Sequence, residues 1–438
     1  MRKRLSAALL PFLVCLGIVG TAGSALASGF AILEQSVRGL GNAFSGSAIA
    51  EDASTIFFNP AGLTRLSGSS VNAAVYYISP SAVFQNTGST IVTGATLTGG
   101  NGGDGGVDVF VPNLYAAWDV SDRIKLGLGI NSPFGLKTKY NDSWVGRYYA
   151  IDSELTTINI NPTVAAKLTD NLSFGAGINL QYAKAKLSNA IDFGLIGFNN
   201  RLPTRPQTAD GEVELKGDDL SWGYNLGLLY EPSESTRIGL AFRSPITHNL
   251  EGDADFDVPP AAARLTATGR FTDSDIKAKL KLPATISLNA YQQISPRLAA
   301  TADITWTGWS RFEELRIEFD NPVQPDNILP ENWHDTFRYS LGLNYALNNA
   351  WQLRAGVAYD PSPADEEYIT PRIPDSNRTW LAIGASYKAS DSFSFDIGYA
   401  HLFVDDTEIN QVSTTNGNLR GNFDNSVDII GLQLNWMF

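Results

Sequence analysis

The sequence predicts an all-β protein, a transmembrane antiparallel β-barrel of about fourteen strands with an N-terminal plug in its lumen. Three observations support this fold class. Apolar and polar residues alternate along many segments that reach or exceed the roughly 9–11 residues a tilted strand needs to cross a bilayer. Aromatic residues lie toward the ends of the apolar rows, as they do in the girdles of membrane barrels. The chain also ends in an amphipathic strand that closes with Phe438.

Residues 1–27 predict a secretory signal peptide. Three basic residues precede a mostly apolar run from 7 to 19, and 25–27 read Ala-Leu-Ala, a small-x-small cleavage site. The apolar run is short for a membrane-spanning helix, so we expect a cleaved targeting signal and not a membrane anchor. Cys15 makes a lipidated protein the alternative interpretation, but Val14 before it is not a small residue.

The chain after the signal peptide is acidic and has no cysteine. The whole chain carries a formal net charge of -13, and its first 27 residues contribute three positive charges, which leaves -16 for residues 28–438. Without cysteine there is no disulfide framework and no thiol chemistry. The acidity argues against nucleic acid as a partner.

Residues 28–68 are expected to form the plug, and residues 69–438 the barrel around it. The plug segment is rich in Gly, Ala and Ser, which interrupt regular structure. It also holds four phenylalanines, Phe30, Phe44, Phe57 and Phe58. A segment this small cannot form a core alone, so we expect it to fold against the inner wall of the barrel.

The barrel segments are even in number, as in bacterial single-chain barrels. Short turns with Asp, Asn, Ser and Pro alternate strictly with long connections. Since the short turns of such barrels are periplasmic, both termini and the plug are expected at the periplasmic end. The alternation predicts strands at 69–79, 108–120, 122–131, 153–169, 171–187, 214–231, 235–250, 274–294, 296–319, 333–347, 349–360, 376–389, 391–405 and 424–438.

The sequence shows no enzymatic constellation, so we expect no catalytic residue, no metal and no cofactor. Its three histidines, His248, His334 and His401, lie in separate segments without metal-ligand spacing. A Ser–His pair that meets only in space stays open as an alternative. The glycine-rich run 98–106 lacks the Gly-Lys-Ser/Thr ending of a phosphate loop, and we interpret it as a flexible outer loop.

The plug segment carries a family resemblance. Residues 39–43 read Gly-Leu-Gly-Asn-Ala, residues 51–55 read Glu-Asp-Ala-Ser-Thr, and residues 59–62 read Asn-Pro-Ala-Gly. This pattern resembles the N-terminal hatch of the FadL family, outer-membrane transporters of long-chain fatty acids and other hydrophobic compounds. We therefore call residues 28–68 the hatch. Weaker similarity continues to the C-terminus. The residues of the hatch motif are Gly39, Gly41, Asn59, Pro60, Ala61 and Gly62.

The segment 131–136, Asn-Ser-Pro-Phe-Gly-Leu, predicts a strand kink. Pro133 removes a ladder donor and Gly135 permits unusual backbone angles, so a strand that arrives at Asn131 should bend or lose pairing. In the FadL family the corresponding strand is kinked inward and leaves a lateral opening in the wall, and the resemblance implies the same here. An ordinary strand end that enters a loop is the alternative.

A hydrophobic acid needs an apolar channel and a cation for its head group, because an unpaired carboxylate is costly to desolvate. By alternation we expect three arginines on the lumen face, and Arg316 lies in a segment that resembles the family's source of a basic binding residue. Pairing with wall carboxylates is the alternative for each arginine. A second basic position of the family is Asn189 here. The expected ligand-binding residues are Phe30, Phe44, Phe57, Phe134, Arg316, Arg338 and Arg354.

The resemblance implies passive uptake of hydrophobic molecules, most of all long-chain fatty acids, across the bacterial outer membrane by a monomer. The expected partners are a hydrophobic small-molecule substrate and outer-membrane lipid. An aromatic-hydrocarbon channel and a surface structural or adhesion barrel are the alternatives, and an enzyme comes third.

Overall fold

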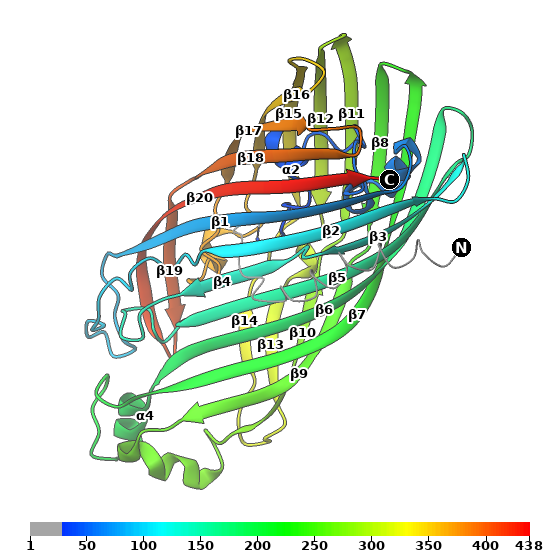
Figure 1. Ribbon diagram of the computed structural model, residues 1–438. Coiled ribbons are helices and arrows are strands. Elements are labelled where there is room, and N and C mark those ends of the chain that lie inside the picture. Colours follow the sequence, from blue (N-terminus) through cyan, green and yellow to red (C-terminus); the bar gives the residue numbers. More distant parts are fainter. Residues whose placement is uncertain (1–28) are drawn as a thin grey trace.

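The strands close into one antiparallel barrel (Figure 1). The computed structural model of the chain describes residues 29–438, so the predicted signal peptide lies outside the described residues. Six of the twenty strand segments continue the preceding segment after a break, which leaves the fourteen wall strands that the sequence predicts. In chain order these are β1 (Ser70–Asn86), β2 (Val109–Asp119), β3 with β4 (Ile124–Asn131 and Gly135–Lys139), β5 (Asp152–Lys167), β6 (Leu172–Asp192), β7 (Asp210–Ser233), β8 with β9 (Thr236–Arg243 and Ile246–Asp257), β10 with β11 (Ser274–Leu282 and Thr285–Ser295), β12 with β13 (Leu298–Thr307 and Glu314–Phe319), β14 with β15 (Asn327–Pro330 and Thr336–Ala346), β16 (Trp351–Asp360), β17 (Arg378–Lys388), β18 with β19 (Phe393–Val404 and Thr407–Ser413) and β20 (Gly417–Met437).

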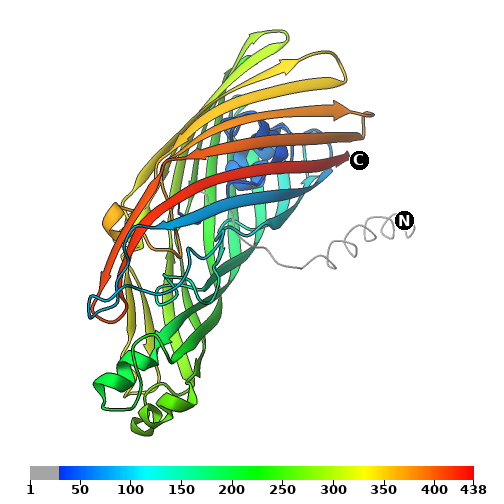
Figure 2. The same cartoon turned by 90° about the vertical axis from the view of Figure 1, so that its left-hand side faces the viewer.

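The first and last strands close the ring over an unbroken register. β1 pairs with β20 from Ser70 opposite Met437 to Asn86 opposite Gly421. Both strands are longer than the alternation predicts, because their outer ends continue above the apolar rows. The tight turns and the C-terminus lie at one end of the barrel, whereas α4 (Phe193–Asn199) and η2 (Pro260–Thr268) lie at the other end (Figure 2). Short turns mark the periplasmic end, so these helices mark the outer end.

The face that carries the apolar side chains changes along the strands. Near the short turns apolar residues point outward, and Trp222 of β7 is 68% exposed while its neighbour on the other face, Asn225, is buried. Toward the outer end the order reverses. Ile276 and Leu280 of β10 are buried inside the barrel, and the two lysines between them, Lys277 and Lys279, are exposed. In the half of the barrel near the short turns, apolar side chains therefore cover the outer surface. In the half near the outer loops, they line the interior.

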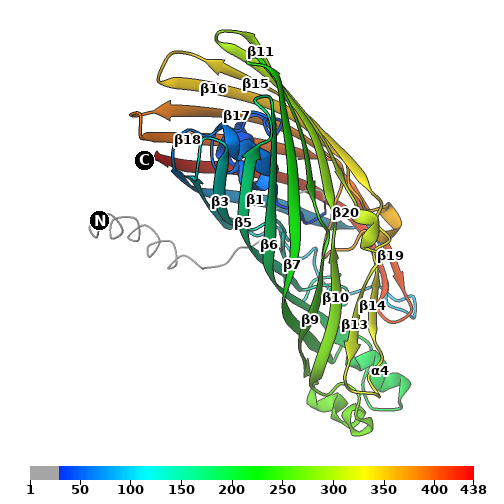
Figure 3. The same cartoon turned by 90° about the vertical axis from the view of Figure 1, so that its right-hand side faces the viewer.

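The hatch lies inside the ring of strands, near the end that holds the C-terminus (Figure 3). It contains three short helical segments, α2 (Val37–Gly41), α3 (Thr55–Phe58) and η1 (Pro60–Arg65). Ser36 caps α2 by accepting a hydrogen bond from the Gly39 amide. On the side of β5, β6 and β7 the hatch meets buried asparagines that bond one another, and Asn225 donates to the Ile56 carbonyl oxygen at 3.1 Å. Such pairing satisfies polar groups that the barrel buries.

Glycines on the inner wall allow the hatch backbone to approach it directly. A Cβ added to Gly384 of β17 would lie 2.8 Å from the Gly41 Cα, and one added to Gly356 of β16 would meet the backbone of Asn42. The Asn-Pro-Ala-Gly motif docks in the same way, because a Cβ at Gly227 of β7 would meet the Asn59 side chain. The small residues of the motif and the glycines of the wall therefore face one another and allow the two backbones to come into contact.

Candidate functional site

An apolar cavity occupies the outer half of the lumen, above the hatch. It holds about 800 Å³ of empty space, including the part that is open to solvent. Its walls come from the reversed, inward-facing apolar residues of the outer strands. No group of three or more His, Cys, Asp or Glu among residues 29–438 is placed to hold a metal ion, and no helix in that range is long and apolar enough to cross a membrane. The main apolar lining residues are Leu136, Leu155, Leu187, Leu215, Leu250, Ile276, Leu280, Phe312, Leu315, Ile317, Leu329 and Ile373.

One buried arginine, Arg372, reaches this cavity from the loop between β16 and β17. Its Nη1 donates to the Ser153 Oγ at 3.0 Å, and its Nη2 donates to the Asn189 Oδ1 at 3.1 Å. Its Nε makes no hydrogen bond. Burial lowers the pKa of Arg372 to about 10, so the guanidinium stays charged at neutral pH. The cavity wall therefore holds a fixed cation whose Nε is buried and has no hydrogen-bond partner.

A buried carboxyl group, Glu331, lines the same cavity just after β14. Burial raises the pKa of Glu331 to about 8, against the opposing effects of the nearby Trp333 indole and of the Arg372 charge. Glu331 is thus largely protonated at neutral pH. A neutral Glu331 leaves the positive charge of Arg372 available to a ligand.

Phe30, at the start of the hatch, forms the floor of the cavity. Its ring centroid lies 4.9 Å from that of Trp309, which belongs to η3 (Trp309–Arg311), and 5.5 Å from that of Phe312. The Phe134 ring centroid lies 6.1 Å from that of Phe30 and 6.3 Å from that of Trp309. The Gly29 amide donates to the Asp375 Oδ2 at 3.0 Å, which ties the hatch terminus to the loop that carries Arg372.

The strand that contains Pro133 is broken where the sequence predicts a kink. β3 ends at Asn131 and β4 begins at Gly135. The segment between them bends inward to the hatch: the Ile32 amide donates to the Pro133 carbonyl oxygen at 2.9 Å, and the Gly135 amide donates to the Phe30 carbonyl oxygen at 2.9 Å. β4 keeps its ladder with β5, and no ladder joins β4 to β2 among the described residues. The other side of β4 has no ladder among residues 29–438, but it contacts the loop before β2: Thr138 forms an isolated bridge with Gly106, and the Lys139 amide donates to the Gly105 carbonyl oxygen at 3.0 Å.

The prediction that Arg316 faces the lumen is wrong. Leu315 and Ile317 line the cavity, while Arg316 points outward and pairs with Glu314 at 2.9 Å and with Asp326 at 3.2 Å. The alternation rule assumed that the greasy face always points to lipid. Arg316 lies in the outer half, where that order is reversed.

The other predicted residues lie in the hatch contacts and not in the apolar cavity. Arg338 donates to the Ala43 carbonyl oxygen at 2.9 Å, and Arg354 pairs with Glu51 at 2.9 Å. Phe44 stacks on Phe58 with ring centroids 6.0 Å apart. Phe57 also packs on Phe58, and the Arg243 guanidinium lies over the Phe57 ring. Of the expected ligand-binding set, only Phe30 lines the cavity, with Phe134 beside it.

Two functional candidates, Arg372 and Glu331, were not predicted. Both lie outside the alternating strands, so periodicity gave no sign of them. A signal for the cavity itself was present in β10, where apolar residues alternate with Lys277, Lys279 and Lys281. Three lysines cannot face the membrane core, so this row had to lie beyond it, with its apolar face inward.

Comparison with known proteins agrees with this architecture. The model of the family described as outer membrane protein transport protein (OMPP1/FadL/TodX) matches residues 18–438. The long-chain fatty acid transport protein of Escherichia coli K12 is 30% identical over 423 residues, which cover 91% of this chain and 92% of that protein. Among solved structures, a Pseudomonas aeruginosa FadL homologue matches with a TM-score of 0.87 and 24% identity, over 94% of this chain and 100% of that one.

The fold also matches the P. putida toluene transporter TodX, with a TM-score of 0.67 and 18% identity, over 88% of this chain and 94% of that one. Similarity at this level of identity shows the shared fold. The family model spans nearly the whole chain, and the relatives include proteins named as outer membrane proteins. The chain therefore belongs to the OMPP1/FadL/TodX family and is an outer-membrane transporter of hydrophobic compounds.

Proposed function

We propose that this chain takes up long-chain fatty acids passively across the outer membrane. The observation that carries the proposal is the buried, charged Arg372 at the wall of a mostly apolar cavity, whose lining also includes Glu154, Lys216 and Glu331. A fatty acid offers one carboxylate and a long apolar tail, which match these two features. A neutral hydrocarbon has no group that requires a buried cation, and burying an unused charge is costly.

The protonated state of Glu331 supports a carboxylate ligand. An ionised Glu331 would repel the head group and compete for Arg372, whereas the neutral acid donates a hydrogen bond instead. The free Nε of Arg372 supplies a charge-assisted donor, the stronger kind of hydrogen bond. We infer that the head group lies between these two side chains and that the tail fills the apolar lining.

The route that we propose is lateral. Ligand enters from the outer loops, binds in the cavity against Phe30, and leaves through the wall beside the break at 132–134 when the hatch terminus moves. The break supports this route because it joins the hatch to the side of β4 that has no strand ladder among residues 29–438. A greasy ligand released there reaches lipid without crossing water.

Calorimetric binding to the detergent-purified barrel tests the head-group site. Oleate, oleyl alcohol and toluene are titrated into the wild type, Arg372→Gln and Arg372→Lys. Loss of a charge-assisted bond costs about 1.5–3 kcal/mol, so Arg372→Gln should weaken oleate binding by about 10- to 150-fold. Arg372→Lys should restore part of the affinity, and the alcohol should bind all three proteins alike.

The matched control is Arg316→Gln, an arginine of the same outer half that points outward. It should leave oleate binding unchanged. Equal binding of oleate by wild type and Arg372→Gln would contradict the proposal, and tight toluene binding indifferent to Arg372 would instead indicate a hydrocarbon channel.

The lateral route has its own test. A Cβ at residue 135 would lie 2.7 Å from the Ile32 Cδ1, so Gly135→Val crowds the Ile32 side chain where the kinked segment meets the hatch. Combined with Pro133→Thr, which restores a ladder donor, it should straighten the strand and lower uptake without affecting folding. Unchanged transport by the well-folded variant would rule out the lateral route.

A further inference from the structure

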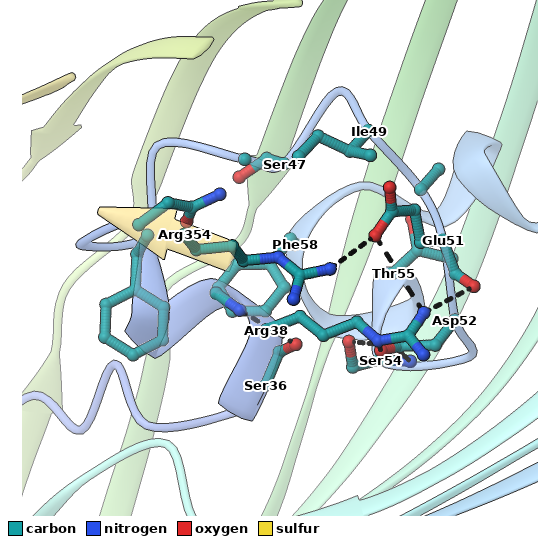
Figure 4. Close-up of a pocket in the computed structure, with 15 residues that line it drawn as sticks. Ser36, Arg38, Ser47, Ile49, Glu51, Asp52, Ser54, Thr55, Phe58 and Arg354 are labelled. Carbon is teal, nitrogen blue, oxygen red and sulfur yellow. Dashed lines mark hydrogen bonds and ion pairs between the residues drawn. The ribbon is translucent and has the colours of Figure 1, made fainter. Parts of the chain in front are cut away.

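A second cavity lies within the hatch, on the side of the short turns (Figure 4). It holds about 420 Å³ of empty space, including its open part. Hatch residues form nearly all of its lining, and Arg354 of β16 completes it. Arg354 lies three residues after Trp351, the first residue of β16 beyond a tight turn. The cavity is therefore separated by the hatch from the apolar cavity that holds Arg372.

Arg354 is buried and depends on one carboxylate. Its side chain is 2% exposed, and its Nη2 donates to the Glu51 Oε2 at 2.9 Å. Its Nη1 donates to the Ser386 hydroxyl, and its Nε makes no hydrogen bond. Glu51 is its single ion-pair partner among residues 29–438. Removal of that carboxylate would leave a buried guanidinium without a counter-charge, which is costly.

A second guanidinium, that of Arg38, lies on the other side of Glu51 (Figure 4). The Arg38 Nη1 lies 3.9 Å from the same Glu51 Oε2, while its Nε is bound to Asp396 at 3.0 Å. One carboxylate oxygen is therefore shared between two arginines. Rings and an aliphatic side chain, those of Phe44, Phe58 and Ile49, line the same cavity. Arg38 is also paired with Asp52, which lines the cavity, at 3.6 Å, so Arg354 is the guanidinium that depends on Glu51 alone. Arg354 beside these apolar side chains forms a cradle for an amphiphilic carboxylate.

Glu51 is the most exposed charged residue of this cluster. Its side chain is 32% exposed, and it follows Ala50, which has a left-handed φ of 51°. Ala43 and Phe44, at the other end of the same loop, also have left-handed φ values. Left-handed backbone is unfavourable for residues with a Cβ, so the loop is held in place by its contacts with the wall.

We propose that this cavity is a second site for the carboxylate of an amphiphile, and that Glu51 occupies it while the hatch is closed. An incoming carboxylate replaces Glu51 on Arg354 and Arg38, so the buried charge stays paired. Glu51 is then released, and with it the ion pair that ties the hatch loop to β16. The inference rests on the proposed function for the identity of the amphiphile as a fatty acid.

The test is calorimetric titration of decanoate, a soluble fatty-acid anion, into the full-length mature barrel. The wild type should bind one decanoate, at the Arg372 site. Glu51→Gln removes the competing charge and should reveal a second molecule, with at least about a tenfold gain in affinity at that site. Adding Arg354→Gln to Glu51→Gln should abolish the second event. Asp122→Asn, an acidic residue in a periplasmic turn, is the matched control and should behave as wild type.

Two further ligands define the class. Acetate carries the head group without a chain, and decanol carries the chain without a charge. Neither should produce the second event. A second event produced equally by acetate would overturn an amphiphile site in favour of a simple anion site.

A labelling measurement covers the case in which Glu51→Gln loosens the hatch. Ser47 lines the cavity, and residues 28–438 contain no cysteine, so Ser47→Cys introduces a single thiol. Decanoate should slow its reaction with N-ethylmaleimide at least about fivefold in the Glu51→Gln background, and not when Arg354→Gln is added. Unchanged stoichiometry together with unprotected labelling would overturn the inference.

The two proposals fail separately. Arg372→Gln should remove the first decanoate and leave the second site of Glu51→Gln intact. If only the proposed function is wrong, Arg372→Gln will bind decanoate as the wild type does, whether or not Glu51→Gln reveals a second decanoate.

Discussion

The contact between Gly41 of the hatch and Gly384 of the wall predicts a specific effect of a single methyl group. In Gly384→Ala the new Cβ would lie 2.8 Å from the Gly41 Cα, whereas carbon atoms prefer about 3.5–4.0 Å. The facing atom is backbone and cannot rotate away, so the hatch helix α2 has to move away from β17 by roughly 0.7–1.2 Å. Such overpacking typically costs about 1–3 kcal/mol.

This cost falls on the docked state of the hatch. A cost of 1–3 kcal/mol raises the ratio of undocked to docked hatch by about 5- to 150-fold, since each 1.4 kcal/mol is a factor of ten. Planar-bilayer conductance measures the ratio directly, because an undocked hatch leaves an aqueous path. Gly384→Ala should show more frequent or larger openings than wild type.

A glycine in open space provides the control. A Cβ at Gly100, in an outer loop, meets nothing within 4 Å, so Gly100→Ala should conduct as wild type does. Wild-type conductance from a folded Gly384→Ala barrel would refute the claim that close backbone contact holds the hatch.

Three other outcomes are expected. Burial raises the pKa of Glu34, a hatch carboxyl, from its usual 4.5 to about 7, despite the nearby charges of Arg338 and Arg378. Protonated Glu34 therefore stabilises the docked hatch fully below pH 4.5, and this stabilisation is lost as the pH rises through 7. Relative to the labelling rate of a free thiol at the same pH, maleimide labelling of Ser47→Cys should accelerate from pH 5 to pH 8, and Glu34→Gln should flatten that relative profile; a relative profile that keeps its slope in the variant would contradict the assignment. The Thr157 hydroxyl donates to the Phe134 carbonyl oxygen at 2.6 Å and accepts from the Phe134 amide at 3.1 Å, so Thr157→Val should destabilise the kink by about 1–3 kcal/mol and reduce uptake, and normal uptake would count against the kink. Asn59 accepts from the Ala61 amide at 3.1 Å and donates to the Leu228 carbonyl oxygen at 2.9 Å, so Asn59→Ala should weaken hatch docking by about 1–2 kcal/mol, seen as faster proteolysis of the hatch; unchanged proteolysis would show that the motif does not anchor it.

The barrel could be predicted from sequence because its signal is periodic. Rows such as Trp222 to Tyr230 must point one way in a strand, and turn residues mark where each strand ends. The kink at Pro133 was predictable for a different reason, because proline lacks the amide donor that strand pairing needs. Both predictions depend on local chemistry alone.

The site was less predictable because its residues meet only in space. Arg316 was misplaced because alternation alone does not say which side of a strand faces water. Arg372 reaches the cavity from an irregular loop and is held by residues more than 180 positions away, such as Asn189. Wall glycines such as Gly384 resemble any small lumen residue until the hatch is placed against them.

The central claim, that a fatty-acid head group binds Arg372 in the outer apolar cavity, is tested most directly by a crystal structure with a bromine-tagged fatty acid. The account predicts the carboxylate within hydrogen-bonding distance of the Arg372 Nε and the bromine among the apolar residues near Leu250 and Ile276. A ligand whose carboxylate lies away from Arg372, or a cavity that stays empty while the ligand binds elsewhere, would contradict it.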